Sequence, residues 1–311
     1  MRPFRFGFQF MSADAAEVAR SARAAEAAGF DVFQVADHVG AQPTPLVALG
    51  AAAAATSTIG LGTLVLNNDL HHPVVLAQEV ATLDQLSGGR VELGLGAGHS
   101  FTEYAAMGLP FDPPGVRKAR LAESVEIVRA LLDGQVVRHE GTHYSVVDAR
   151  TLRPTQAHVP LLVGVNGRAA LAHAARHADT VGLTMLGRTK EDGQHHEVRW
   201  EADRLDATVD WIRGAVGTTE VPELHALVQL ILETDDRRAA AEELEAELHT
   251  RPADILSTPF LCLGTHEEMA RHLLACRERW GISYFSVRDV DAFAPVMQLV
   301  RRLDDGTADN S

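Results

Sequence analysis

The sequence contains little cysteine and no long apolar run. Its two cysteines, Cys262 and Cys276, lie among apolar residues at a near-helical spacing. This predicts packing rather than a disulfide, because disulfides are rare in the cytosol. No apolar run reaches the ~20 residues that a membrane-spanning helix requires, and MRPFRFGFQF at the start lacks the apolar segment and cleavage site of a signal peptide. These absences predict a cytoplasmic protein with no membrane partner.

Positive charge is also scarce. The 311 residues include 28 Lys and Arg against 42 Asp and Glu, for a net charge of -14. No cluster of basic residues offsets this locally, so the chain would repel a phosphate backbone and nucleic acid is not an expected partner. With 46% apolar residues, the chain is long enough for one large domain or two ordinary ones.

The sequence does contain a regular alternation of short apolar segments with amphipathic or Ala-rich segments. The apolar segments show little residue-by-residue alternation, which is typical of parallel strands buried on both faces. Eight strands are expected, at residues 4–10, 32–35, 59–66, 91–95, 160–165, 180–185, 225–232 and 284–287. Helices are expected at about 14–28, 45–56, 73–87, 117–132, 168–178, 197–212, 236–249, 266–280 and 293–303. A hairpin is expected around Gly141.

Eight strands, each followed by a helix, predict an α/β fold of the (βα)8 TIM-type barrel class, with rim insertions at 99–117 and 186–200. A doubly wound open sheet is the alternative. It usually has fewer strands and a glycine-rich phosphate fingerprint after the first one, where this chain has MSADAAE. We expect a single domain over 1–303 and a disordered tail over 304–311.

Polar residues follow the second strand at the edge where barrel enzymes place their chemistry. The strand runs directly into Asp37 and His38. One interpretation is structural, with Asp37 capping a turn and His38 packed beside it. The other is that the pair belongs to a site, in which Asp37 either sets the tautomer of His38 or binds a ligand.

Small residues follow three other strands, in NND (67–69), GLGAGHS (94–100) and GVNGR (164–168). The glycines at these ends are either turn residues or positions where a flat ligand approaches the backbone. In GVNGR the N–H groups that open the next helix, together with Arg168, suit a phosphate. These segments therefore indicate a cofactor site on the carboxyl rim.

Metal chemistry is the other possibility that 15 histidines raise. Metal-binding barrel hydrolases typically carry His-x-His at the end of the first strand, where this chain has FGFQF. The pairs His71–His72 and His195–His196 are adjacent, and neighbours on a strand point to opposite faces. We expect no catalytic metal. A G-x-S-x-G nucleophile elbow is also absent.

The chain resembles the bacterial luciferase-like superfamily of flavin and deazaflavin oxidoreductases, and within it the branch that uses coenzyme F420. The resemblance covers most of the chain in order, and its most specific part is residues 59–98. The matching segments are GFDVFQVADH (29–38), IGLGTLVLNNDLHHPVVLAQEVATLDQLSGGRVELGLGAG (59–98), EYAAMGLPF (103–111), GTHY (141–144), LLVGVNG (161–167), HADTVGL (177–183) and WGISYFSV (280–287).

The resemblance implies roles for particular residues. His38 is the candidate proton donor or acceptor, and Asp37 lies beside the cofactor. A non-proline cis peptide is implied at Leu64–Val65, behind the cofactor ring. The residues implied beside the ring and its ribityl chain are Gly96, Ala97, Gly98, His99 and Thr102. Those implied on the phosphate side are Gly164, Val165, Asn166, Gly167 and Arg168.

The implied function is hydride transfer between F420 and a small organic substrate, by a homodimer. An FMN-dependent monooxygenase and a non-catalytic barrel subunit are the alternatives. Two departures from the family pattern bear on the choice. VGAQPTP follows the Asp-His pair where some members have an aromatic residue, which weakens a sugar phosphate as the substrate. Only Arg168, Arg188 and Lys190 are obvious cations for the F420 tail, so the choice between F420 and FMN stays open.

Overall fold

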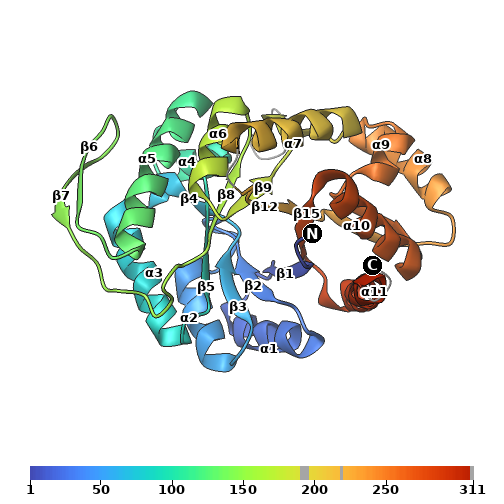
Figure 1. Cartoon of the computed structure of the whole chain (residues 1–311), viewed down its shortest axis with the longest axis horizontal. Helices are drawn as coiled ribbons and strands as arrows, with labels where there is room; N and C mark the ends of the chain where they lie inside the picture. Colours follow the sequence, from blue (N-terminus) through green and yellow to red (C-terminus); the bar gives the residue numbers. More distant parts are fainter. Residues whose placement is uncertain (190–195, 218–219, 309–311) are drawn as a thin grey trace.

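The structure, a computed structural model, describes residues 1–189, 196–217 and 220–308. It is a closed barrel of parallel strands surrounded by helices (Figure 1). The barrel strands are β1 (Arg5–Phe10), β2 (Val32–Val35), β3 (Gly60–Thr63), β5 (Val91–Gly96), β8 (Leu161–Val165), β9 (Thr180–Leu183), β12 (Glu223–Leu227) and β15 (Ile282–Val287). The predicted (βα)8 fold and all eight strands are confirmed, although β12 and β15 begin two residues earlier than predicted.

The barrel closes through β3. The strand order β3-β2-β1-β15-β12-β9-β8-β5 becomes a ring because β3 also pairs with β5. A short strand, β4 (Leu66–Asn67), continues the path of β3 and places Asn67 opposite Gly96. The carboxyl ends of β2, β3, β5 and β8 are therefore consecutive along one rim. Most of the residues that the sequence singled out follow these four strands.

Helices cover the outside of the barrel, and local chemistry fixes several of their ends. A proline opens α2, α3 and α5, where a missing backbone donor costs nothing. Left-handed glycines end α1, α3 and α10. The main helices are α1 (Val18–Ala28), α2 (Pro45–Ala55), α3 (Pro73–Ser87), α5 (Pro114–Leu132), α6 (Arg168–His177), α7 (Ala202–Val216), α8 (Arg237–Leu248), α10 (His266–Trp280) and α11 (Val290–Ala308).

The insertions between the barrel strands form two antiparallel strand pairs and a short helix. The predicted hairpin around Gly141 is confirmed as the antiparallel pair β6 (Val137–Glu140) and β7 (Ser145–Ala149). The first rim insertion contains a helix that was not predicted, α4 (Phe101–Ala106). The second contains β10 (Leu186–Thr189) and β11 (His196–Val198), and its residues 190–195 lie outside the described ones.

The seventh strand and the helix before it have boundaries that differ from the prediction, and one short helix was not predicted. The seventh strand does not continue to residue 232, because Leu230–Glu233 is a separate strand, β13, that pairs with β14 (Leu261–Gly264). A continuous apolar run does not reveal where a chain leaves one sheet for another. The helix expected from 197 begins at Ala202, because β11 occupies the start of that segment. The short helix α9 (Pro252–Ser257) was also not predicted.

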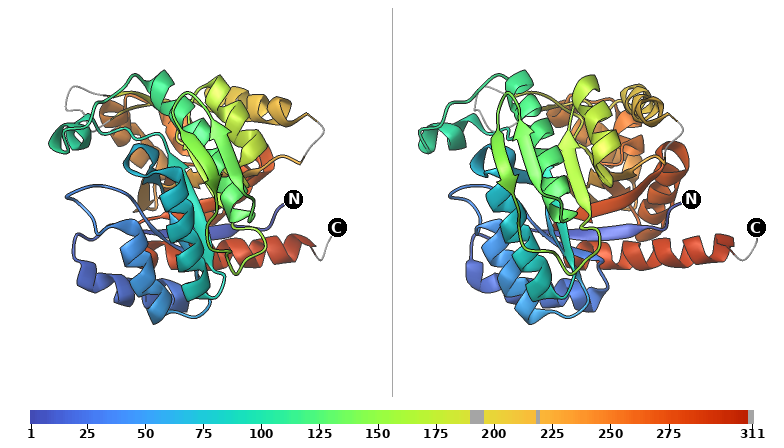
Figure 2. Two further views of the ribbon diagram at one scale, coloured as in Figure 1. Left: turned by 90° about the vertical axis from the view of Figure 1, so that its left-hand side faces the viewer. Right: turned by 60° about the vertical axis from the view of Figure 1, so that its left-hand side comes forward.

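The C-terminal helix is longer than expected. α11 runs to Ala308 and projects at one side of the molecule (Figure 2). The expectation of a disordered tail is therefore wrong for residues 304–308, where Asp304 accepts a hydrogen bond of 2.8 Å from Arg277 Nη1. Residues 309–311 lie outside the described ones. None of the helices that the structure describes combines the length and apolarity needed to cross a lipid bilayer.

The barrel interior is polar, in contrast to the apolar layer between strands and helices. Gln34 Nε2 donates to the Tyr284 hydroxyl at 2.8 Å, and that hydroxyl donates to Glu92 at 3.0 Å. Ser286 Oγ donates to Gln34 Oε1 at 2.6 Å, so the Ser286 oxygen is left to accept from His225 Nε2 at 2.8 Å. The side chains of this network thus satisfy one another, as burial requires.

His225 is held neutral in this network. Burial, and then the positive charge of Arg5, lower the pKa of His225 to about 3. Arg5 forms ion pairs of 2.6 Å with both Glu92 and Glu223. The interior histidine is therefore a structural group and has no place in proton transfer at neutral pH.

Candidate active site

The Asp37 side chain contacts the segment after β4 and not its sequence neighbour, His38. Its Oδ2 accepts a hydrogen bond from the backbone N of Asn67 at 3.1 Å and lies 3.0 Å from His71 Nε2. Asp37 therefore ties the end of β2 to the segment that follows β4. The idea that Asp37 sets the tautomer of His38 is wrong, because both of its described partners lie elsewhere.

His38 is paired with a carboxylate that the sequence did not indicate. Its Nδ1 lies 2.9 Å from Glu103 Oε1, in the first turn of α4. The His38 ring also meets the His99 ring edge-on, with centroids 5.5 Å apart. The His38 side chain keeps 35% of its surface exposed, against 18% for Glu103. A titratable group with a carboxylate behind it and access to solvent is the arrangement that proton transfer requires.

The floor of the site is the third strand. The peptide bond between Leu64 and Val65 is cis, at the position that the family resemblance implies. Gln9 Nε2 donates to the Leu64 carbonyl at 2.7 Å, and Arg288 Nε donates to Gln9 Oε1 at 2.8 Å. Residues from β1 and from the end of β15 therefore support this peptide from inside the barrel.

Two of the glycines on the rim are explained by protein neighbours. A Cβ on Gly96 would lie 2.7 Å from Val65 Cγ2, and one on Gly98 would clash with Asn67 and Tyr104. Gly98 also has a positive φ of 71°. Their lack of side chains thus lets β5 and its loop pack against the segment after the cis peptide. Close packing within the protein is therefore enough to explain these two glycines, without a ligand beside them.

The remaining predicted residues of this loop are placed by two helices. Arg117 of α5 is buried and donates from Nη1 to the Ala97 carbonyl at 3.1 Å and to the Gly98 carbonyl. Thr102 Oγ1 shares a hydrogen bond of 3.0 Å with Ser100, the N-cap of α4. Arg117 was not predicted, because nothing in the sequence relates it to the loop twenty residues before it.

The phosphate side begins at Gly167, which precedes α6 with a φ of 87° and a ψ of 143°. Only glycine adopts such a conformation readily. Asn166 donates from Nδ2 to the Leu186 carbonyl at 3.2 Å, while its Oδ1 is buried with no partner among the described residues. The hydroxyl of Thr184, after β9, is likewise buried without a partner there, and its methyl group lies 4.0 Å from a Cβ built on Gly164.

The cation at this helix start is Lys118, which the sequence did not indicate. Its Nζ lies 3.5 Å from a Cβ built on Gly167, and no carboxylate within the described ranges pairs with it. Burial, and then Arg117, lower the pKa of Lys118. Arg168 instead stacks on Trp211 of α7, 4.9 Å from its ring centroid. The side chains of Arg188 and Lys190 lie outside the described residues.

Two of the predicted residues, Val165 and Leu64, have buried side chains that pack against other apolar residues. Val165 is buried at 6% exposure in the apolar layer beneath the helices. Leu64 is buried at 8% in a small cluster inside the barrel with Val32, Leu162 and Tyr284. The structure brings the His38 and His99 rings together on one part of the rim, with Asn166 and Gly167 on another.

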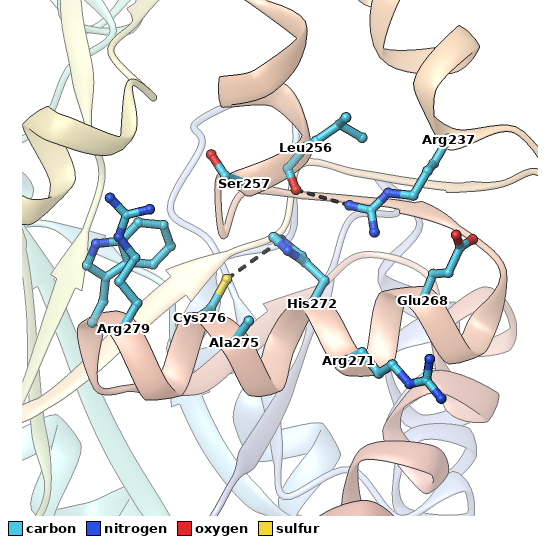
Figure 3. Close-up of a pocket in the computed structure, with 10 residues that line it drawn as sticks. Arg237, Leu256, Ser257, Glu268, Arg271, His272, Ala275, Cys276 and Arg279 are labelled. Atoms are coloured by element: carbon cyan, nitrogen blue, oxygen red, sulfur yellow. Dashed lines mark hydrogen bonds between the residues drawn. The ribbon is translucent and has the colours of Figure 1, made fainter.

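A pocket between α8, α9 and α10 is a separate feature, on the outside of the barrel (Figure 3). Cys276 Sγ lies there 3.6 Å from His272 Nε2. That nitrogen donates to the Thr258 carbonyl at 2.9 Å, so it cannot also accept the thiol proton. Burial raises the pKa of Cys276 and lowers that of His272 to about 4. The pair is therefore no activated nucleophile.

Comparison with known proteins identifies the family of the chain. The family model for luciferase-like monooxygenases matches residues 4–284. An F420-dependent glucose-6-phosphate dehydrogenase from Amycolatopsis mediterranei is 34% identical over 265 residues, which cover 78% of this chain and 80% of that relative. One of the same name from Beutenbergia cavernae is 43% identical over 163 residues, which cover 50% of this chain and 48% of the relative. Matches to two more relatives of that name cover 55% and 59% of their lengths.

A solved structure shares the fold at lower identity. The coenzyme F420 dependent tetrahydromethanopterin reductase from Methanopyrus kandleri superposes with a TM-score of 0.76 at 20% identity. The match covers 97% of this chain and 99% of that chain. At this identity the similarity concerns the fold alone, and it agrees with the closed barrel.

Proposed function

The chain belongs to the luciferase-like monooxygenase family, and from this premise we propose that it is an F420-dependent oxidoreductase. It transfers a hydride between F420 and a small organic substrate, by reducing a C=C or C=N bond or by oxidising an alcohol. One observation carries the proposal. A histidine–carboxylate pair follows β2, and the start of α6, with Lys118 of α5 beside it, follows β8, three strands along the same rim.

The residues present fit a phosphate-bearing deazaflavin. Asn166 Oδ1 and the Thr184 hydroxyl are buried polar atoms without described partners, and a polar ligand would satisfy both. The free N–H groups that open α6, with Lys118 beside them, would hold the phosphate. We propose that the cofactor is bordered by Asp37, Leu64, Val65, Gly96, Ala97, Gly98, His99, Thr102, Gly164, Val165, Asn166, Gly167 and Arg168.

The proton in this reaction is assigned to His38. Bound F420 supplies a ring carbon that gives or takes a hydride. The Glu103 carboxylate accepts the Nδ1–H of His38, which leaves Nε2 as the atom that takes a proton from an alcohol or returns one to a reduced substrate. Glu103 also stabilises the imidazolium that forms when Nε2 is protonated.

Binding titrations separate this function from its alternatives. Quenching of cofactor fluorescence by the purified protein gives the Kd for F420 and for FMN. Micromolar or tighter binding of F420 without FMN binding supports the proposal. Preference for FMN, followed by oxygen uptake with reduced FMN, would instead establish a monooxygenase. Binding of neither would leave a non-catalytic barrel.

Replacing Lys118 by alanine tests the phosphate side. Loss of a charged hydrogen bond costs about 1.5–3 kcal/mol, so F420 should bind roughly 10- to 100-fold more weakly. Affinity for the deazaflavin riboside that lacks the phosphate should be unchanged, because Lys118 would not contact it. Arg168→Ala is the comparison variant, since that guanidinium stacks on Trp211, and a smaller effect is expected. Equal weakening for both ligands in Lys118→Ala would contradict the assignment.

The substrate, assembly and location follow from the same proposal. The relatives' sugar phosphate is one candidate, and small secondary alcohols and conjugated alkenes or imines are others.

We further propose that residues 1–303 act as one domain in a cytoplasmic homodimer. Light scattering on the eluting protein tests the dimer, and a mass of about 67 kDa, twice that of the 33.5 kDa chain, is expected.

A further inference from the structure

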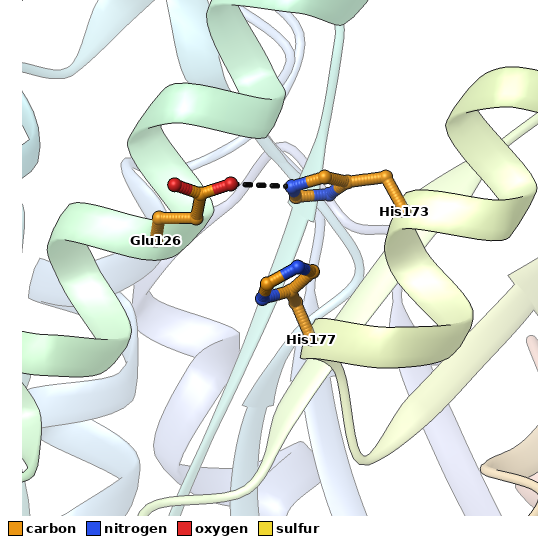
Figure 4. A group of neighbouring side chains, drawn as sticks. All are labelled: Glu126, His173 and His177. Carbon is orange, nitrogen blue, oxygen red and sulfur yellow. Dashed lines mark hydrogen bonds and ion pairs between the residues drawn. The ribbon is translucent and has the colours of Figure 1, made fainter. Parts of the chain in front are cut away.

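The outer surface between α5 and α6 carries a cluster that the proposed function does not use. His173 and His177 lie four residues apart on α6, and Glu126 lies on the neighbouring α5. Figure 4 shows the two imidazole rings one above the other, with Glu126 facing His173. The ring centroids are 4.3 Å apart, and Glu126 Oε1 lies 3.0 Å from His173 Nε2.

We propose that Glu126, His173 and His177 form a binding site for a divalent transition metal ion of the Zn²⁺ type. One ligand atom from each residue lies within 4.8 Å of the other two. Ligand atoms around a tetrahedral zinc are about 3.4 Å apart, given bonds of roughly 2.1 Å. The three side chains would close on the ion by rotation about their side-chain bonds.

The ligand set selects the class of metal. Two imidazole nitrogens and one carboxylate oxygen are the ligands of many zinc sites, with water in the fourth position. Mg²⁺ and Ca²⁺ prefer oxygen ligands alone. Histidines four residues apart on a helix present both nitrogens on the same face, as the segment HAARH (173–177) does here.

A simple ion pair explains only part of the cluster. The pair accounts for the contact between Glu126 and His173. It does not explain why the His177 ring stacks on the His173 ring. A metal ion gives all three groups a common partner. The Glu126 side chain is 49% exposed and that of His173 is 18% exposed, so an ion can enter from solvent without opening the fold.

The ion would join two helices that reach the cofactor rim. Glu126 lies eight residues along α5 from Lys118, about 12 Å at the rise of an α-helix. His173 lies five residues from the start of α6, about 8 Å. The site is therefore a clamp that holds α5 against α6, at a distance from the reacting atoms. It should raise stability and leave F420 binding intact.

Zinc binding to the tag-free, chelator-treated full chain tests the clamp. Isothermal titration with ZnCl₂ should give one ion per chain with a micromolar or tighter Kd. The unfolding midpoint should rise by about 5 °C when free Zn²⁺ is 100 times the Kd. A wild-type protein with no rise in midpoint, or with a millimolar Kd, would overturn the proposal.

The sharpest variant is His177→Ala, because it leaves the Glu126–His173 pair intact and so should fold. Zinc affinity should fall at least 10-fold and the rise in midpoint should disappear. His266→Ala is the matched control, since His266 also faces a carboxylate, Glu233, at 3.6 Å. Unchanged affinity in His177→Ala, or an equal loss in His266→Ala, would refute the site. F420 titration of the same samples reports the proposed function separately.

Discussion

Replacing His38 by alanine should lower turnover about 100-fold or more while the Kd for F420 changes little. The variant removes the atom that moves the proton, and general acid–base catalysis contributes roughly 100- to 10,000-fold to a rate. The cofactor's phosphate and ring contacts lie on other residues, so its affinity is the internal control. Turnover is measured by F420 absorbance with whichever alcohol, sugar phosphate or alkene supports the reaction.

Glu103→Gln distinguishes a proton-transfer role for His38 from a packing role. The glutamine keeps an oxygen 2.9 Å from His38 Nδ1 but removes the charge that stabilises an imidazolium. For alcohol oxidation, turnover should fall about 10-fold or more, because the protonated ring then has no carboxylate beside it. Undiminished turnover in His38→Ala would end the assignment. Unchanged turnover in Glu103→Gln would show that the Glu103 carboxylate has no part in the proton transfer.

Lowering the pH from 8 to 5 should cost about 2 kcal/mol of unfolding free energy through His225 alone. The pKa of His225 falls to about 3 in the fold because the ring is buried beside Arg5, whereas an unfolded histidine titrates near 6.5. Between these values the unfolded chain binds the proton and the folded chain does not. The stability is therefore complete above pH 6.5 and is lost as pH falls toward 3. His272, whose pKa is lowered to about 4, adds a loss of similar size over this pH range, because both lowered pKa values lie below pH 5.

Urea unfolding of His225→Gln at pH 8 and pH 5 checks this contribution. Glutamine retains a donor for Ser286 Oγ but does not titrate, so the loss of stability between the two pH values should shrink by about 2 kcal/mol. His249→Asn is the control, because His249 is exposed and asparagine tolerates its positive φ of 50°. An unchanged pH dependence in His225→Gln would mean that folding does not lower the pKa of His225.

The barrel was predictable because each strand can be recognised from the composition of its own residues. Segments such as Val32–Val35 are mostly apolar and are buried at every position, which suits strands covered on both faces, and a proline or glycine marks most helix ends. The break between β12 and β13 was missed, since the apolar run 223–233 hides the change of sheet. The helical residues 304–308 were missed because an ion pair from Asp304 to a distant arginine holds them.

The sequence by itself determined the eight-strand order and the placement of Asp37, His38 and the glycine-rich ends on one rim. It also indicated the cis peptide at Leu64–Val65, through the family resemblance. Residues that follow strands are recognisable in a sequence, because strand ends are local and parallel strands share one edge.

Only the tertiary structure decided which groups meet across the rim. Glu103 reaches His38 from a helix 65 residues away, and Lys118 reaches Gly167 from the preceding outer helix. In the folded chain the Asp37 carboxylate also pairs with His71, and the Arg168 guanidinium stacks on the Trp211 ring. No periodicity or spacing relates such pairs, because the contact depends on how separate helices pack against the barrel. Ion pairing and hydrogen bonding act over a few ångströms in space, whatever the separation in sequence.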